Sequence, residues 1–210
     1  MNTHLHSPTC RRCGQCCLKG GPALHLEDLP LLAAGVLKRA RLMTLRAGEP
    51  VHENVAGKVT ELDTEIVKVA GGGAGFACGF LDPRANACLI HENRPAECRA
   101  LFCEDTSAIE GLYLRGRLTR ADIVDTGGGL WELVEFHGQA FPAAMAASLA
   151  RQAWDGSRRA IVTLTDLVEA EQSFRRAFLD RTGVTPEELD FYFGRSLARI
   201  CAPFGVTLPE

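Results

Sequence analysis

The spacing of the cysteines constrains this chain more than any other feature. Eight of its nine cysteines fall in two groups within the first half of the 210 residues. The first group, in CRRCGQCC, has the spacing C-x2-C-x2-C-C, and the second has C-x9-C-x9-C-x4-C. Buried structural thiols have no reason to fall into two tight groups, so the pattern indicates metal ligation by thiolates. The predicted ligands are Cys10, Cys13, Cys16, Cys17, Cys78, Cys88, Cys98 and Cys103.

The start of the first group matches a known iron–sulfur pattern. Cys10, Cys13 and Cys16 have the C-x2-C-x2-C spacing that wraps a [4Fe–4S] cubane in bacterial ferredoxins. No Cys-Pro follows three residues later, so the match is partial and the fourth ligand comes from elsewhere in the chain. Thiolates suit both zinc and iron–sulfur clusters, so the spacing leaves both metals open.

The adjacent pair Cys16-Cys17 gives a sharper prediction. Neighbouring side chains diverge in most backbone conformations, so two adjacent cysteines are poorly placed to share one tetrahedral ion. We therefore predict that Cys16 and Cys17 do not ligate the same ion. Either the doublet joins two sites of four thiolates each, or one of its two cysteines is not a ligand.

Four arginines close to the cysteines are candidates for a supporting role. A centre with four thiolates carries a formal charge of about −2, with Zn²⁺ or with a [4Fe–4S]²⁺ core. Nearby guanidinium groups can offset this charge and donate hydrogen bonds to sulfur. The candidates are Arg11, Arg12, Arg94 and Arg99, for which ordinary surface charge is the alternative interpretation.

The sequence around Cys98 predicts a short helix. Pro95 suits the first turn, so we expect a helix over about residues 95–101. Cys98 would then lie in the first turn, where the helix dipole favours thiolate. If Cys98 and Cys103 both bind metal, the helix must end before Cys103, because residues five apart on one helix point to different faces.

Composition and charge argue against several classes of partner. The net charge of −3 gives no general attraction to nucleic acid or to acidic membranes. The first ten residues lack an apolar signal region, and no stretch approaches the ~18 continuous apolar residues of a membrane span. We therefore expect a cytoplasmic protein with neither nucleic acid nor membrane as partner. Cytoplasmic thiols stay reduced, which favours metal binding over disulfides.

Periodicity predicts an α+β, mostly helical fold. We expect a cysteine-rich module of loops and short strands over residues 1–105, packed with a helical part over residues 106–210 as one globular unit. In the first half, the patterns indicate a helix through 26–36, a strand over 58–70, a flexible turn at the glycines 71–75, and two extended pieces flanking a turn at 82–86.

The second half shows helical periods and capping signals. Two helical pieces should break near Gly138 and Pro142, and a third places Leu164, Val168 and Phe178 on one face. A further helix should begin at Thr185 and run to Cys201, with Pro186 in its first position and a capping box closed by Glu188. Cys201 then lies on its apolar face and is interpreted as a small buried hydrophobe.

The cysteine segments together resemble a known family. CRRCGQCC followed by CGFLDPRANACLIHENRPAECRALFC is similar to the YkgJ-like cysteine-cluster family of zinc- or iron-chelating domains. The resemblance covers the first half of the chain, with His91 in place of the usual Tyr and one extra residue before Cys103. It implies metal or iron–sulfur binding but no particular reaction, and such a domain also resembles the cysteine-rich part of flagellin lysine methylases, which is associated with an iron–sulfur cluster. The matching residues are Leu81, Asp82, Cys88, Ile90, Glu92, Arg94, Pro95, Cys98, Arg99 and Cys103.

Three functions follow from these patterns. The first is a protein with at least one [4Fe–4S] cluster and a redox, electron-transfer or accessory role, with Zn²⁺ as an alternative or additional metal and an unidentified protein or redox partner. The second is a structural zinc protein whose helical half binds a partner. The third is a metal-dependent enzyme such as a protein methyltransferase. His91 and His137 are candidate bases or ligands, but no catalytic motif accompanies them, so enzymatic activity is left open.

Overall fold

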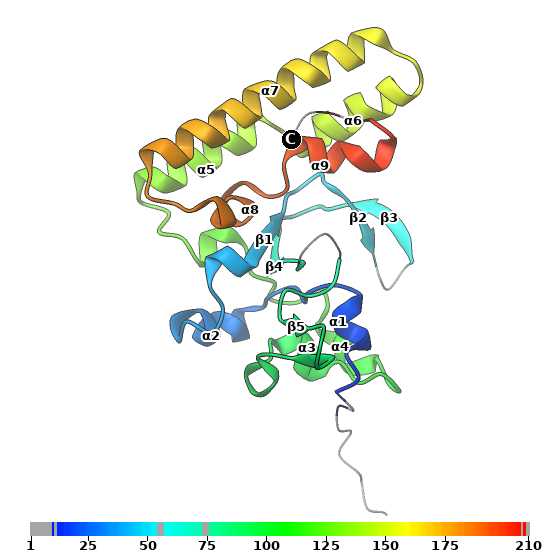
Figure 1. Ribbon diagram of the computed structural model, residues 1–210, viewed down its shortest axis with the longest axis vertical. Helices are drawn as coiled ribbons and strands as arrows, with labels where there is room; N and C mark the ends of the chain where they lie inside the picture. The colour runs from blue at the N-terminus through cyan, green and yellow to red at the C-terminus, as the bar shows by residue number, and fades with distance from the viewer. Residues whose placement is uncertain (1–9, 11, 54–56, 73–75, 207, 209–210) are drawn as a thin grey trace, which may run out of the picture. The chain divides into compact units, whose positions relative to one another are not determined.

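The computed structural model describes residues 10, 12–53, 57–72, 76–206 and 208 (Figure 1). Its contacts divide the chain into two compact units. Residues 1–37 with 69–117 form the first, here called the cysteine unit, and residues 38–68 with 118–210 form the second, here called the helical unit. The expected α+β, mostly helical fold is confirmed. The predicted division between residues 1–105 and 106–210 stays a prediction, because units defined by their internal contacts do not show which segments fold independently.

The cysteine unit is built from short elements. Strands β5 (Leu81–Asp82) and β6 (Ala87–Cys88) pair antiparallel with Leu81 opposite Cys88, as the two predicted extended pieces require. Its helices are α1 (Gln15–Leu18), the 3₁₀ helix η1 (Leu26–Asp28), α2 (Leu29–Ala33), the 3₁₀ helix η3 (His91–Asn93), α3 (Ala96–Ala100) and α4 (Ser107–Leu112). Helix α3 confirms the short helix predicted after Pro95, and it ends before Cys103.

Helix α2 is shorter than its apolar spacing predicts. Pro30 lies in the first turn, as expected, but the helix ends at Ala33. Gly35 follows with φ +70, a left-handed conformation that favours glycine and terminates helices. The amides of Val36 and Leu37 then both donate to the Leu31 carbonyl. The apolar residues after Ala33 are therefore held by a tight turn and not by a continuing helix.

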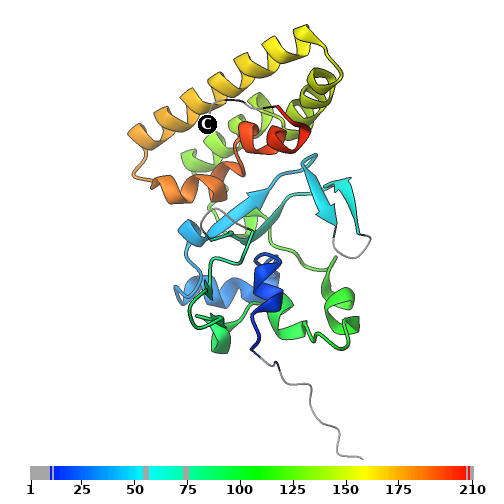
Figure 2. The same cartoon turned by 45° about the vertical axis from the view of Figure 1, so that its right-hand side comes forward.

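The strand predicted over residues 58–70 is two strands with different partners. Strand β3 (Lys58–Glu61) pairs antiparallel with β2 (Pro50–Glu53), and Figure 2 shows this pair in cyan. Strand β4 (Ile66–Val69) pairs with β1 (Leu42–Leu45). The polar stretch between β3 and β4 breaks the alternation, and residues 73–75 of the predicted glycine turn lie outside the described residues.

The helical unit carries the longer helices. The α-helices among its described residues are α5 (Gly129–Ala140), α6 (Ala143–Trp154), α7 (Arg158–Arg181), α8 (Leu189–Phe193) and α9 (Leu197–Cys201). The predicted break at Pro142 separates α5 from α6, whereas Gly138 is accommodated inside α5. The capping box at Thr185 forms on a 3₁₀ turn, η5 (Pro186–Glu188), that leads into α8. The single helix predicted to follow is wrong, because Gly194, with φ +71, ends α8 and α9 starts afresh.

The core of the helical unit lies between α6, α7 and α9. Helix α6 turns a face of small residues inward, with Ala146, Ala147 and Ala150 fully buried, and α7 lies alongside it (Figure 1). Cys201 is also fully buried, and its thiol donates to the Ala146 carbonyl at 3.6 Å. Its interpretation as a buried hydrophobe is confirmed. Within the described part of the chain, no helix combines the length and apolarity needed to cross a bilayer.

Candidate metal centre

Seven of the eight clustered cysteines line one cavity of about 160 Å³ in the cysteine unit. They are Cys10, Cys13, Cys16, Cys17, Cys88, Cys98 and Cys103. The eighth, Cys78, is buried, and its backbone N–H donates to the Cys17 carbonyl at 2.7 Å. All nine cysteines of the chain belong to the described residues, and none of them forms a disulfide. The fold thus brings together two cysteine groups that are separated by 60 intervening residues in the sequence.

The doublet has a geometry that the sequence argument did not anticipate. The Sγ atoms of Cys16 and Cys17 lie 4.0 Å apart at the start of α1, so the premise that the two side chains diverge is wrong. Two thiolates on a tetrahedral Zn²⁺ are about 3.8 Å apart, given a Zn–S distance of about 2.3 Å. The doublet therefore has the spacing of thiolates that share an ion. That Cys16 and Cys17 serve different ions stays a prediction.

Burial and mutual repulsion keep the inner thiols protonated in the absence of a cation. Burial, and then the neighbouring Cys16 thiol, raise the pKa of Cys17 to about 12. Burial likewise raises the pKa of Cys98, with Cys78 as the next cause. The prediction that the thiolate form of Cys98 is favoured at the start of α3 is wrong for the protein without metal. Desolvation of the Cys98 thiol, which raises its pKa, outweighs the dipole of a five-residue helix. A bound cation reverses this balance and deprotonates its thiol ligands.

The thiols surround a space and do not converge on a point. Among the residues that the structure describes, no three His, Cys, Asp or Glu side chains form a group that could hold a single ion. The remaining lining residues supply guanidinium, imidazole, carboxylate and apolar groups: Arg12, Gly14, His91, Arg94, Leu101, Phe102 and Glu104. The donor set is dominated by soft sulfur ligands, which fits zinc and iron–sulfur centres.

The four candidate arginines occupy different places. Arg12 and Arg94 line the cavity, and the buried Nε of Arg94 has no hydrogen-bond partner among the described residues. Arg99 is not among the lining residues, since it donates to the Arg94 carbonyl at 2.6 Å and lies 3.9 Å from Asp28. Arg11 lies outside the described residues. A supporting role for these arginines stays a prediction.

A chain of polar contacts links the two cysteine groups at the cavity wall. Arg94 donates to Nε2 of His91 at 3.0 Å, so the imidazole proton is on Nδ1, which donates to Glu92 at 3.3 Å. Arg12 donates to the same Glu92 oxygen at 3.0 Å. The hydrogen bond from His91, followed by the charge of Arg12, lowers the pKa of Glu92. Sequence reasoning gave Glu92 no role, although it belongs to the family pattern.

The loop of the first group is held by a residue that sequence analysis placed only in a turn. Asn86, in a left-handed conformation with φ +48, donates from Nδ2 to the Cys13 carbonyl at 2.7 Å. Gly14 lies against it with φ +73, and a Cβ there would be 2.3 Å from the Asn86 Oδ1. The sequence of the turn predicts that an asparagine such as Asn86 can adopt a positive φ. It does not predict the hydrogen bond from Asn86 to Cys13.

Three buried ionisable residues were also missed. Asp28 accepts from the backbone N–H groups of His25 and Ala96, and Glu97 accepts from that of Ala23. Burial alone would lower the pKa of His25, but hydrogen bonds to Glu97 and to the Arg115 carbonyl outweigh it and raise the pKa. Burial raises the pKa of Asp28. The only sequence signal is a histidine three residues before an aspartate, the spacing of the capping box that starts η1.

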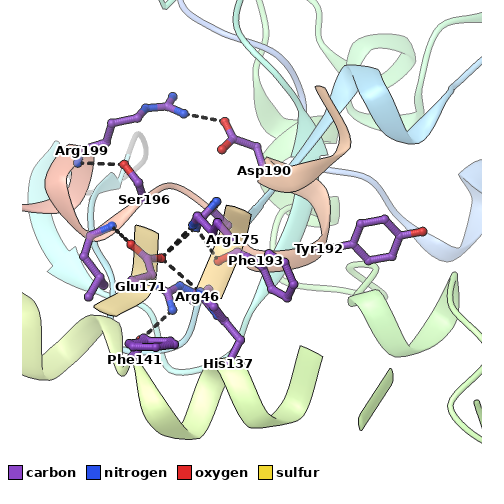
Figure 3. Close-up of polar contacts among 12 residues, drawn as sticks. Arg46, His137, Phe141, Glu171, Arg175, Asp190, Tyr192, Phe193, Ser196 and Arg199 are labelled. Carbon is purple, nitrogen blue, oxygen red and sulfur yellow. Dashed lines mark hydrogen bonds and ion pairs between the residues drawn. The ribbon is translucent and has the colours of Figure 1, made fainter. Parts of the chain in front are cut away.

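His137, a candidate base or ligand, lies in the helical unit and is fully buried (Figure 3). Its Nε2 donates to Glu171 at 3.1 Å, and Arg175 donates to the same carboxylate oxygen at 2.9 Å. Burial lowers the pKa of His137 to about 4. Burial also opposes the charge on Glu171, but hydrogen bonds and the Arg175 charge lower its pKa to about 2. This cluster stabilises the core and offers no surface to a substrate.

The unit and its thiol-lined cavity define a cysteine-rich, metal-chelating domain. Residues 9–110 match the family model CxxCxxCC, described as "Putative zinc- or iron-chelating domain", so the resemblance to a cysteine-cluster family noted in the sequence is confirmed. Metal chelation through cysteines is the property that the match supports, with zinc and iron both open. Comparison with curated proteins gives no match, and comparison with solved structures gives none either.

Proposed function

We propose that the cysteine unit binds a [4Fe–4S] cluster and that the protein has a redox role, in electron transfer or as an accessory to another protein. The observation that carries the proposal is the cavity of about 160 Å³ surrounded by thiols. Four thiolates about 2.3 Å from a single Zn²⁺ leave no open volume between them. A cubane of four irons and four sulfides, in contrast, fills a space between its cysteine ligands.

The charges on the cavity wall support an anionic centre. A [4Fe–4S]²⁺ core with four thiolates carries about −2. Arg12 and Arg94 line the cavity, and the Nε of Arg94 is a buried donor without a partner among the described residues. A buried unpaired donor is costly, and a thiolate or sulfide is an acceptor that would satisfy it.

The exposure of the thiols supports exchange of electrons with a partner. Cys10, Cys13 and Cys103 are exposed, whereas Cys78 is buried and the other four are intermediate. One side of the cavity is thus open to an approaching protein, while Leu101 and Phe102 supply apolar wall. When bound, the cluster supplies one-electron redox chemistry, and the chain's residues hold it, offset its charge and limit the access of water.

Eight thiols exceed the needs of one four-thiolate centre. We propose that the four thiols left over hold a second cluster or a Zn²⁺, with the doublet at the junction of the two centres. The 4.0 Å separation of Cys16 and Cys17 supports the alternative for at least one ion, a structural Zn²⁺ that both residues ligate. In that case the metal staples the two cysteine groups, and the helical unit binds a partner.

An enzymatic role gains little from the candidate histidines. His137 is fully buried and bonded to Glu171, and His91 is bonded on both nitrogens within the cavity wall. Methyl transfer to a protein therefore rests on the resemblance to flagellin lysine methylases alone. We propose the redox role ahead of it.

The test is metal and sulfide analysis of protein purified without oxygen. We expect iron and acid-labile sulfide in equal amounts, with broad absorption near about 400 nm that bleaches on reduction. Cys98→Ser should lower the iron content, whereas Cys201→Ser is the matched control, because that thiol is buried in the helical unit. Colourless protein with stoichiometric zinc would refute the [4Fe–4S] proposal and support the structural Zn²⁺ site. Protein without any metal would refute both proposals.

A further inference from the structure

We propose that Asp28 and Glu97 are positioning residues of the metal centre, which hold helix α3 so that Cys98 faces the cavity. This inference rests on the proposed function, because it assumes that Cys98 is a ligand. Neither residue is a ligand in the proposal. Each acts through the backbone of the segment that carries or faces Cys98.

Asp28 joins two segments that are far apart in sequence. Its side chain is fully buried, and its two oxygens accept from two different backbone N–H groups. Oδ1 accepts from Ala96, the first residue of α3, at 2.8 Å, and Oδ2 accepts from His25 at 3.0 Å. Helix α3 has no side-chain cap of its own at Pro95, so its first N–H is satisfied by a carboxylate 68 residues away.

Glu97 makes the reciprocal connection one residue further along α3. It is buried, and its Oε2 accepts from the Ala23 backbone N–H at 2.8 Å. Its Oε1 lies 3.4 Å from Nε2 of His25, whose Nδ1 donates to the Arg115 carbonyl at 2.7 Å. The segment 23–28 is therefore bonded twice to α3, once through its own carboxylate and once through that of the helix.

Two directional anchors on successive residues fix the rotation of α3 as well as its position. Cys98 follows Glu97 directly, so the direction of its Sγ depends on that rotation. A helix of five residues is not stable by itself, and its orientation must come from tertiary contacts. An apolar pair at these positions would bury similar area but would leave the rotation unspecified.

The geometry of a metal centre makes this orientation matter. Metal–sulfur distances must be met within about 0.2 Å, so a small rotation of α3 weakens the bond to Cys98. Loss of an outer residue that orients a ligand typically costs about 10–100-fold in metal affinity. We expect losses of this size when either carboxylate is replaced by its amide, since an amide keeps one acceptor but presents N–H₂ where the second acceptor was.

The experiment compares D28N and E97Q with wild type and with D122N. Asp122 is the control, because it also closes a capping box on a 3₁₀ turn, accepting from the Thr119 N–H at 2.8 Å, but it is exposed and lies in the helical unit. Protein loaded with Co²⁺ alone reports thiolate coordination through its sulfur-to-cobalt absorption. The rate of Co²⁺ transfer to a chelator then measures how well the site holds the ion.

We expect D28N and E97Q to lose Co²⁺ about 10–100-fold faster than wild type and to show weaker thiolate absorption, with D122N unchanged. Wild-type rates and spectra in E97Q would overturn the proposal, even if D28N fails to fold, because E97Q leaves only one of the two acceptor oxygens that Glu97 presents to Ala23 and His25. Equal losses in D122N would overturn it too, since they would show that replacing a capping aspartate far from the cavity has the same effect. Wild-type protein that binds no Co²⁺ and no iron would instead refute the proposed function.

Discussion

The thiol of Cys17 combines two properties that matter for its chemistry. It lies 4.0 Å from the thiol of Cys16, and burial raises its pKa to about 12. A protonated thiol is a poor nucleophile and a poor ligand, so the inner cysteines become reactive only when a cation draws off the proton. Cys10, Cys13 and Cys103, in contrast, are exposed to solvent at the rim of the cavity.

This contrast predicts the order in which the cysteines react in metal-free protein. We expect Cys10, Cys13 and Cys103 to be alkylated by N-ethylmaleimide at pH 8 at least about tenfold faster than Cys17 and Cys98. Peptide mass mapping over a time course measures the order. Equal labelling of Cys17 and Cys10 would contradict the burial described for Cys17.

The buried pair His137–Glu171 predicts a pH dependence of stability. The folded protein keeps His137 neutral down to a pKa of about 4, whereas the unfolded residue takes up a proton near pH 6.5. The unfolded state thus binds more protons between these values, and the free energy of unfolding falls as the pH drops from about 6.5 to about 4, by about 3 kcal/mol. Glu171, with its pKa lowered from 4.5 to about 2, extends the loss below pH 4.5.

Urea unfolding followed by tryptophan fluorescence measures this effect in the right unit. Both tryptophans of the chain, Trp131 and Trp154, lie in the helical unit, so the signal does not report on the cysteine unit. His137→Gln should remove the part of the pH dependence between about 6.5 and about 4. A wild-type stability that stays constant over that range would show that His137 takes up its proton in the folded state as readily as in the unfolded state, which contradicts the lowered pKa.

Among the helices and strands, some boundaries are set by local sequence signals and others by contacts with distant parts of the chain. The capping box at Thr185 and the proline before α3 could be read from the sequence, because each acts within one turn. The split between β3 and β4 could not, because each strand is defined by a partner elsewhere in the chain. Likewise, the end of α8 depends on how closely Gly194 approaches β1, where a Cβ would lie 2.9 Å from the Thr44 carbonyl oxygen.

The break at Gly194 predicts a large cost for a single methyl group. Gly194→Ala places a Cβ on a backbone with φ +71 and against a backbone oxygen that cannot yield easily. Gly57→Ala is the matched control, because Gly57 has φ +63 but no atom within 4 Å of the added Cβ. We expect a loss of about 1 kcal/mol for Gly57→Ala and about 3 kcal/mol for Gly194→Ala. Equal losses in urea unfolding would mean that the contact with Thr44 contributes nothing.

At the scale of the whole molecule, the candidate site was only partly predictable. The spacing of the cysteines identified the thiols, because ligand spacing is a local property. The contacts that hold those thiols join residues that only the folded chain brings together, such as Asp28 with Ala96 and Asn86 with Cys13. No periodicity or motif in the sequence relates the two members of such a pair.

Metal removal should affect the two units differently. The cysteine unit has short elements and two-residue strands, so metal-binding energy forms much of its stability, whereas the helical unit has its own apolar core. Under chelation we expect faster amide hydrogen exchange in residues 76–113 and unchanged exchange in α6 and α7. Hydrogen-exchange mass spectrometry makes the comparison, with Cys201→Ser protein as the control for a thiol outside the cavity. Uniform acceleration across both units would show that they unfold together.

The interleaving of the two units has a consequence for how the protein is made. The residues before 38 belong to the cysteine unit, and the chain then enters the helical unit at residue 38, returns at residue 69 and leaves again after residue 117. During synthesis, the cysteine unit has all of its residues as soon as position 117 has left the ribosome. Strand β1 emerges earlier, but helix α8, which packs against it, follows only at residues 189–193. The order of emergence thus allows metal to bind the cysteines of the nascent chain before the helical unit can fold.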